Sequence, residues 1–219
     1  MQPLPERAVP SLASQLTDAQ RAVIWGEVRN LDSTNGRLVT RWTVITGAPG
    51  SGKTTLVRAL EKRGRKTIRD TAREVLEERI RLGVTNPRSK EAYLDIQNEI
   101  LSRMVHVAEV TSPDEHVFLD YAPPDNLAFL SLAGLPWTAF HVWAACRYRY
   151  KRVCLLDLPP PQLASEQDAI RAETFEQRLL VDRQLTEIYA CLNVRVERIP
   201  YVPLEGRISL VVGTDSSVP

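Results

Sequence analysis

Short apolar runs alternate along most of this chain with longer stretches in which apolar residues recur three or four positions apart. The short runs are typical of buried strands and lie at residues 42–46, 66–68, 117–119, 152–156 and 194–199. The longer stretches are typical of amphipathic helices and lie at residues 17–31, 55–63, 71–82, 89–110, 125–133, 138–150 and in a segment that ends near 191. Because strands and helices alternate, the pattern predicts an α/β fold with a parallel sheet and helices on both faces.

The first apolar run leads into a glycine-rich loop and then into a helix. Residues 47–54 fit the pattern G-x-x-x-x-G-K-[ST], the Walker A motif, at every required position. Glycines let backbone N–H groups curl around a phosphate, and the helix adds the positive end of its dipole. The residues expected to hold a nucleoside triphosphate are Gly47, Ala48, Pro49, Gly50, Ser51, Gly52, Lys53, Thr54 and Thr55.

Two side chains of the expected site would act on the triphosphate and its metal ion. Lys53 would reach the β- and γ-phosphates, and Thr54 would bind Mg²⁺. Asp120 ends an apolar run, where a P-loop protein places the acid that holds Mg²⁺, although an aspartate there can also be a simple turn residue. Nothing resembles the Asn-Lys-x-Asp element that reads guanine, so we expect ATP with Mg²⁺ rather than GTP.

The residues after the second apolar run offer further chemistry. Asp70 opens the next helix, and two interpretations stay open: it caps the helix, or it accepts the proton of a substrate hydroxyl. Arg73 lies at the start of this helix and would hold a substrate anion or pair with an acid. Both lie where the carboxyl ends of the strands are expected to meet.

Arginines also occur in a polar segment that follows the break at Pro159–Pro161. Arg171 and Arg178 lie there, and a mobile lid in this place would bring arginine to the charge that develops on a transferred phosphoryl group. The alternative is a solvated start of a helix. The basic and aromatic cluster at 147–152 is expected to end a helix rather than to bind nucleic acid.

The first forty residues are expected to form an extension that carries one helix. Thr17 to Gln20 has the form of a capping box that opens a helix to about Leu31, with a buried stripe supplied by Ala19, Ala22, Val23 and Val28. A turn at 32–36 follows. We therefore divide the chain into an N-terminal extension, residues 1–40, and a phosphate-loop domain, residues 41–219; the extension would pack on the core or bind a protein partner.

Composition narrows the possibilities further. Lys and Arg number 28 against 27 Asp and Glu, so no overall field attracts nucleic acid or an anionic membrane. No stretch approaches the roughly 18 apolar residues of a membrane span. Cys146, Cys154 and Cys191 lack metal-ligand spacing, as do the histidines, and buried free thiols in a reducing compartment are the expectation. The sequence thus indicates a soluble cytoplasmic protein.

Four segments together resemble a known family: residues 47–56, 70–78, 118–120 and 152–156. In order and spacing they resemble small AAA-type P-loop ATPases similar to the kinase domain of bacterial nicotinamide riboside kinases, over residues 44–212. The resemblance implies a five-stranded P-loop sheet of the nucleoside- and nucleotide-kinase type. It also implies a lid element at 168–173, with Arg171 as its arginine. Two positions depart from the family pattern: Tyr121 replaces an arginine, and Asp70 replaces a glutamate.

Two functions follow from this sequence. In the first, the protein is a small-molecule kinase in which Lys53, Asp70, Arg73 and Arg171 serve the transfer of a phosphoryl group to a nucleoside-like hydroxyl. In the second, it is an ATPase or nucleotide-dependent switch that controls a protein partner through residues 1–40. A remodelling motor is disfavoured because Tyr121 stands where such machines carry a glutamate that polarises water.

Overall fold

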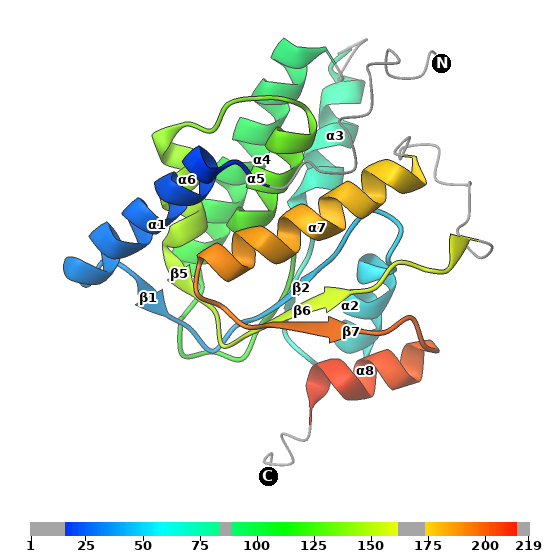
Figure 1. The fold of residues 1–219 in the computed structure, drawn as a ribbon. Coiled ribbons are helices and arrows are strands. Elements are labelled where there is room, and N and C mark those ends of the chain that lie inside the picture. The colour runs from blue at the N-terminus through cyan, green and yellow to red at the C-terminus, as the bar shows by residue number, and fades with distance from the viewer. Residues whose placement is uncertain (1–15, 84–88, 162–173, 214–219) are drawn as a thin grey trace.

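The main sheet is built around the strand that leads into the phosphate loop. A computed structural model describes residues 16–83, 89–161 and 174–213, and within them this sheet has five strands in the order β3-β4-β2-β6-β7 (Figure 1). Every neighbouring pair is parallel. The strands are β2 (Thr43–Thr46), β3 (Thr67–Ile68), β4 (Phe118–Asp120), β6 (Arg152–Leu156) and β7 (Val196–Ile199). The expected parallel five-stranded sheet is confirmed.

Helices cover both faces of the sheet (Figure 1). They are α2 (Lys53–Lys62), α3 (Thr71–Arg81), α4 (Lys90–Val110), α5 (Pro123–Leu132), α6 (Ala139–Cys146), α7 (Phe175–Cys191) and α8 (Leu204–Val212). Successive residues of β2 enter two different cores, because side chains alternate along a strand. Val44 packs into the core that α5, α6 and α7 share, and Ile45 into the core that α2 and α8 share. Both faces of β2 are therefore covered, which fixes the position of the loop that follows it.

The helix expected near the N-terminus is α1 (Asp18–Ser33), and the capping box at its start is confirmed. The N–H of Gln20 donates to Thr17 Oγ1 over 3.1 Å, and the N–H of Thr17 donates to Gln20 Oε1 over 2.9 Å. Its expected buried stripe is wrong. Ala19, Ala22 and Val23 are exposed, whereas Ile24 and Leu31 are buried and Val28 packs against them only in part.

The reason for this error is that α1 lies on α6 and α7 with a different side than expected. Residues 24, 28 and 31 share one face at the i, i+4, i+7 spacing of a helix, and that face enters the core. Packing of α1 against the main core follows one of the two expectations for the first forty residues. The division of the chain at residue 40 stays a prediction.

A second, two-stranded sheet was missed. β1 (Leu38–Val39) pairs in parallel with β5 (Tyr148–Arg149), and the N–H of Leu38 donates to the carbonyl of Arg147 over 2.9 Å. The helix expected to reach residue 150 therefore ends at Cys146, because the backbone beyond it bonds to β1 instead of continuing the helix. In the described part of the chain, no helix combines the length and apolar character needed to cross a membrane.

Candidate functional site

The phosphate loop joins the end of β2 to the start of α2 and depends on its glycines. Gly47, Gly50 and Gly52 have φ values of 148°, 85° and 92°, which residues other than glycine rarely adopt. A Cβ at Gly47 would lie 2.8 Å from Ser51 Oγ and 2.9 Å from the carbonyl oxygen of Leu156. The loop is therefore held against the neighbouring strand β6 at a separation that excludes any side chain at residue 47.

Lys53 begins α2 and is turned back onto the loop. Its side chain is buried, and its ammonium Nζ donates to the carbonyls of Gly47 over 2.7 Å and Ala48 over 2.9 Å. Nζ also lies 4.5 Å from the centre of the Tyr121 ring. The cation thus sits among carbonyl oxygens inside the loop, at the point from which a lysine can turn toward bound phosphates.

The two residues expected to hold Mg²⁺ lie on neighbouring elements. Asp120 ends β4 and is buried, and β4 pairs with β2 so that Asp120 stands opposite Ile45. Thr54 is the second residue of α2 and is half-buried. A carboxylate and a hydroxyl at the carboxyl edge of one sheet are oxygen donors of the kind that Mg²⁺ takes, with phosphate and water as its other ligands. The residues present therefore fit this ion.

Asp70 lies in the connection between β3 and α3, and its cap contact is present. The N–H of Ala72 donates to Asp70 Oδ1 over 2.7 Å, and the side chain is half-buried. Arg73 lies in the first turn of α3 and is also half-buried. Arg171 and the lid element at 168–173 lie outside the described residues. The catalytic roles of Asp70, Arg73 and Arg171 stay predictions.

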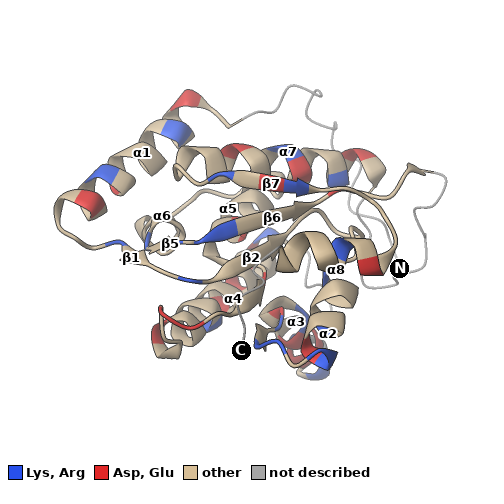
Figure 2. Ribbon diagram, turned by 90° about the horizontal axis from the view of Figure 1, so that it is seen from below, with Lys and Arg blue, Asp and Glu red and all other residues tan. Residues whose placement is uncertain are grey.

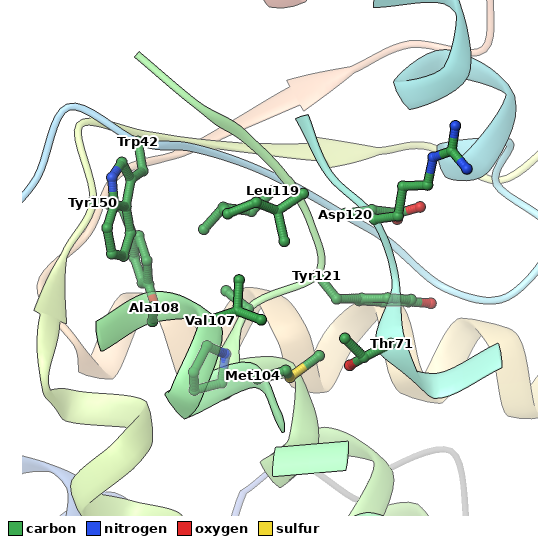
Figure 3. A pocket seen from close by; sticks show the side chains of 13 residues that line it. Trp42, Thr71, Met104, Val107, Ala108, Leu119, Asp120, Tyr121 and Tyr150 are labelled. Carbon is green, nitrogen blue, oxygen red and sulfur yellow. The ribbon is translucent and has the colours of Figure 1, made fainter. Parts of the chain in front are cut away.

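A small cavity opens next to these elements, between the sheet and helices α3 and α4 (Figure 3). Its free space is about 30 Å³, room for about one water molecule. Polar side chains line the end at the carboxyl edge of the sheet, where Asp120 lies, and the rest is largely apolar (Figure 3). The lining includes Trp42, Ile68, Arg69, Thr71, Met104, Val107, Leu119, Asp120, Tyr121 and Tyr150.

One cavity residue, Arg69, was not anticipated. It precedes Asp70, lines the cavity with Asp120 and forms an ion pair with Glu61 at 2.6 Å. The hydrogen bond and the charge of Glu61 raise the pKa of Arg69. The only signal in the sequence was its place beside Asp70, since an arginine in a polar segment has no distinguishing pattern.

Two arginines from the C-terminal helices flank the phosphate loop. Arg178 on α7 approaches its tip so closely that a Cβ on Gly50 would lie 3.1 Å from Arg178 Nη1. Arg178 Nε is buried without a hydrogen-bond partner among the described residues. Arg207 on α8 donates from Nη1 to the carbonyl of Ser51 over 2.8 Å and from Nε to that of Val202 over 2.8 Å. Arg207 was missed because no local pattern links α8 to a loop so far away in sequence.

A buried carboxylate joins the loop to two helices. Asp125, at the start of α5, accepts hydrogen bonds from the Thr46 hydroxyl, from the N–H of Ala122 over 2.8 Å and from the Tyr189 hydroxyl over 2.7 Å. Burial raises its pKa to about 6, although these hydrogen bonds and the charge of Lys53 act in the opposite direction. The carboxylate therefore ties together the end of β2, the turn after β4 and helix α7.

This raised pKa has a consequence for stability that can be measured. The folded state holds the Asp125 proton up to a pKa of about 6, above the ordinary value of 3.8, so this group stabilises the fold fully below pH 3.8. That contribution is lost as the pH rises toward 6, and the shift corresponds to roughly 3 kcal/mol. In urea unfolding between pH 4 and 7, we expect the free energy of unfolding of the native protein to fall as the pH rises. Asp125→Asn should lack this part of the fall. Parallel pH profiles for the two proteins would contradict this assignment.

Charges elsewhere are mixed in sign. Figure 2 shows basic and acidic residues following one another along α1 and α7, so neither helix presents a surface of a single charge. The three cysteines are buried free thiols, as expected, and burial raises the pKa of Cys146 to about 12 and that of Cys154 to about 11. That nucleic acid is not a partner stays a prediction.

Together, the central parallel strand, its glycine loop and the buried lysine define a P-loop protein of the α/β class. A family model described as an AAA domain matches residues 42–207, and the chain therefore belongs to this family of AAA domains. A search of curated proteins finds no match to the sequence.

Two of the solved structures with a similar fold come from a deoxyadenosine kinase and the NadR protein. Deoxyadenosine kinase from M. mycoides, with dCMP and dCDP bound, has a TM-score of 0.55 at 12% identity over 78% of this chain and 96% of that one. The NadR protein in complex with NR has a TM-score of 0.55 at 19% identity over 82% of this chain and 48% of that one. This chain thus spans about half of NadR. These similarities establish the expected P-loop kinase-like fold.

Proposed function

We propose that this protein transfers the γ-phosphoryl group of ATP to a hydroxyl group of a small nucleoside-like acceptor. The observation that carries the proposal is a phosphate loop and a cavity that share one edge of the sheet. Lys53 and Asp120 lie at that edge, Asp120 lines the cavity, and Asp70 lies between two residues that also line it. A bound triphosphate and an acceptor in the cavity would therefore be neighbours.

The proposed reaction is a direct displacement. The acceptor hydroxyl oxygen forms a bond to the γ-phosphorus, the bond to the bridging oxygen of ADP breaks, and the hydroxyl proton passes to the carboxylate of Asp70. Lys53 turns from the loop carbonyls to the phosphates. Arg178, whose charge lies at the tip of the loop, neutralises charge on the transferred group. A magnesium ion held by Thr54 and Asp120 would offset the negative charge of the phosphates.

The cavity supports an acceptor with a flat apolar part. Its walls carry aromatic and aliphatic side chains, and its polar end lies toward Asp120 (Figure 3). The space of about 30 Å³ is too small for a nucleoside as it stands, so side chains must move on binding. Met104 is suited to this, because an unbranched thioether side chain repacks easily.

An acceptor panel tests this function. Purified protein is given Mg·ATP with ribonucleosides, deoxynucleosides, nicotinamide riboside and simple alcohols, and phosphorylated products are measured by mass spectrometry. We expect one acceptor class to raise ATP consumption by about a hundredfold or more over hydrolysis alone, because a positioned hydroxyl replaces bulk water. The same slow hydrolysis with every compound would reject the kinase.

That outcome would favour the alternative, a nucleotide-dependent switch that acts on a protein partner. A specific observation supports this second function: Tyr121 stands after Asp120, where the resembled family carries an arginine that would bind a phosphate or substrate. Under this alternative, residues 1–40 would contact the partner. Recovery of the same partner to an equal extent with and without nucleotide would reject the switch.

A further inference from the structure

Tyr121 occupies a strained turn immediately after the carboxylate that ends β4. Its φ is 71°, in the left-handed region that residues other than glycine rarely adopt. The turn is fixed on both sides, because the N–H of Tyr121 donates to the carbonyl of Ile45 over 3.1 Å and the N–H of Ala122 donates to Asp125. Such strain persists only where the surroundings hold it in place. The turn thus sets the direction of the Tyr121 side chain.

That direction places the ring over the lysine of the phosphate loop. Lys53 Nζ lies 4.5 Å from the ring centre, and the Tyr121 hydroxyl donates to the carbonyl of Gly47 over 3.4 Å. This carbonyl also accepts the hydrogen bond from Lys53 Nζ at 2.7 Å. Phe129 packs edge-on against the Tyr121 ring, with centres 5.7 Å apart. Lys53 and Tyr121 therefore donate to the same carbonyl of the loop, and the Tyr121 ring covers the Lys53 ammonium group.

We propose that Tyr121 is a positioning residue that holds Lys53 withdrawn on the phosphate loop until a nucleotide binds. The face of an aromatic ring attracts an ammonium ion, and loop carbonyls accept its protons. Phosphates must outcompete these contacts to draw Lys53 out. The contact with Tyr121 is thus a cost that nucleotide binding has to overcome. This inference rests on the proposed function only in taking a nucleoside triphosphate as the ligand.

The same ring connects the loop to the cavity. Tyr121 lines the cavity together with Thr71 and Met104 (Figure 3). A molecule in the cavity touches the side chain that covers Lys53, so displacement of the ring would favour release of the lysine. This arrangement suppresses use of ATP while the cavity is empty, because Lys53 stabilises charge on the phosphates only when it is extended.

A double-mutant cycle on Mg·ATP binding tests the proposal. Calorimetry compares the native protein with Tyr121→Leu, Lys53→Met and the double variant. We expect Tyr121→Leu to bind Mg·ATP about three- to tenfold more tightly, the range of a cation–π contact, and to have no effect when Lys53 is already Met. Tyr121→Phe keeps the ring and should bind within about twofold of the native protein. Phe129→Leu, which alters packing beside the ring without touching Lys53, is the matched control.

Tyr121→Asn guards against loss of folding in the leucine variant, because asparagine tolerates left-handed backbone while lacking a ring. Weaker or unchanged Mg·ATP affinity in both ringless variants would overturn the proposal, as would an equal effect in the Lys53→Met background. Urea unfolding without nucleotide separates it from the proposed function. In urea unfolding, the effect of the double variant on the unfolding equilibrium constant should differ from the product of the two single effects by about three- to tenfold, even if the protein binds no ATP. Purely additive effects on the free energy of unfolding would show that Tyr121 and Lys53 do not interact in the nucleotide-free protein, and would overturn the proposal.

Discussion

Lys53→Met is expected to reduce phosphoryl transfer by about a thousandfold or more, because the site loses the one lysine placed within its phosphate loop. The variant chosen is Met rather than Ala since the Lys53 side chain is buried at 2% exposure, and Met fills most of the same volume. The rate of product formation at saturating Mg·ATP measures the effect. Thermal unfolding without nucleotide should show a modest loss of stability, because Met lacks the contacts that Lys53 makes with the loop carbonyls and the Tyr121 ring.

Lys62→Met supplies the control for this substitution. Lys62 ends the same helix α2 at an exposed position, so the change in net charge is identical while the loop is untouched. The control should keep the native rate. Full activity in Lys53→Met would show that the chemistry takes place elsewhere in the molecule.

The second large effect concerns Asp70, where capping and proton transfer can be separated. Asn caps a helix about as well as Asp, so Asp70→Asn should retain the contact that the N–H of Ala72 makes with Asp70 Oδ1. An amide cannot accept the hydroxyl proton, and we expect transfer to fall by about a hundredfold to ten-thousandfold with ATP affinity preserved. The rate of single turnover and a calorimetric titration measure the two quantities.

Two further variants make this result specific. Glu74→Gln removes a charge from the exposed first turn of the same helix α3 and should leave transfer intact. Asp70→Ala removes cap and carboxylate together, and should destabilise the fold by about 1 kcal/mol in addition to the loss of transfer. Native activity in Asp70→Asn would show that Asp70 only caps the helix and does not accept the proton.

Sequence patterns predicted the fold well where they are local. The strand into Gly47, the helix from Lys53 and the capping box at Thr17 each have a signature within a few residues, and all three are present. Failures came where distant backbone competes with local preference. Residues 147–150 continue a helical pattern, but Tyr148 and Arg149 pair with β1 and form a strand instead. The buried face of α1 likewise depends on where α6 and α7 lie.

The site divides in the same way. The phosphate loop and Asp120 were predicted because their chemistry follows a strand directly, whereas Arg207 and the network around Asp125 depend on contacts between segments far apart in sequence. Thr46 and Tyr189 meet at Asp125 from the end of β2 and from α7. No spacing rule links such residues, since tertiary packing alone brings them together.

The hydrogen bond from Arg207 to the carbonyl of Ser51 has a consequence for folding during synthesis. The two residues are 156 positions apart, and β2 also needs β4 and β6, both made later, as its neighbours. A nascent chain that has just emerged from the ribosome with its glycine loop has none of these supports. The ability to bind a nucleotide should therefore arise late in translation, when the segment at 204–212 has left the exit tunnel.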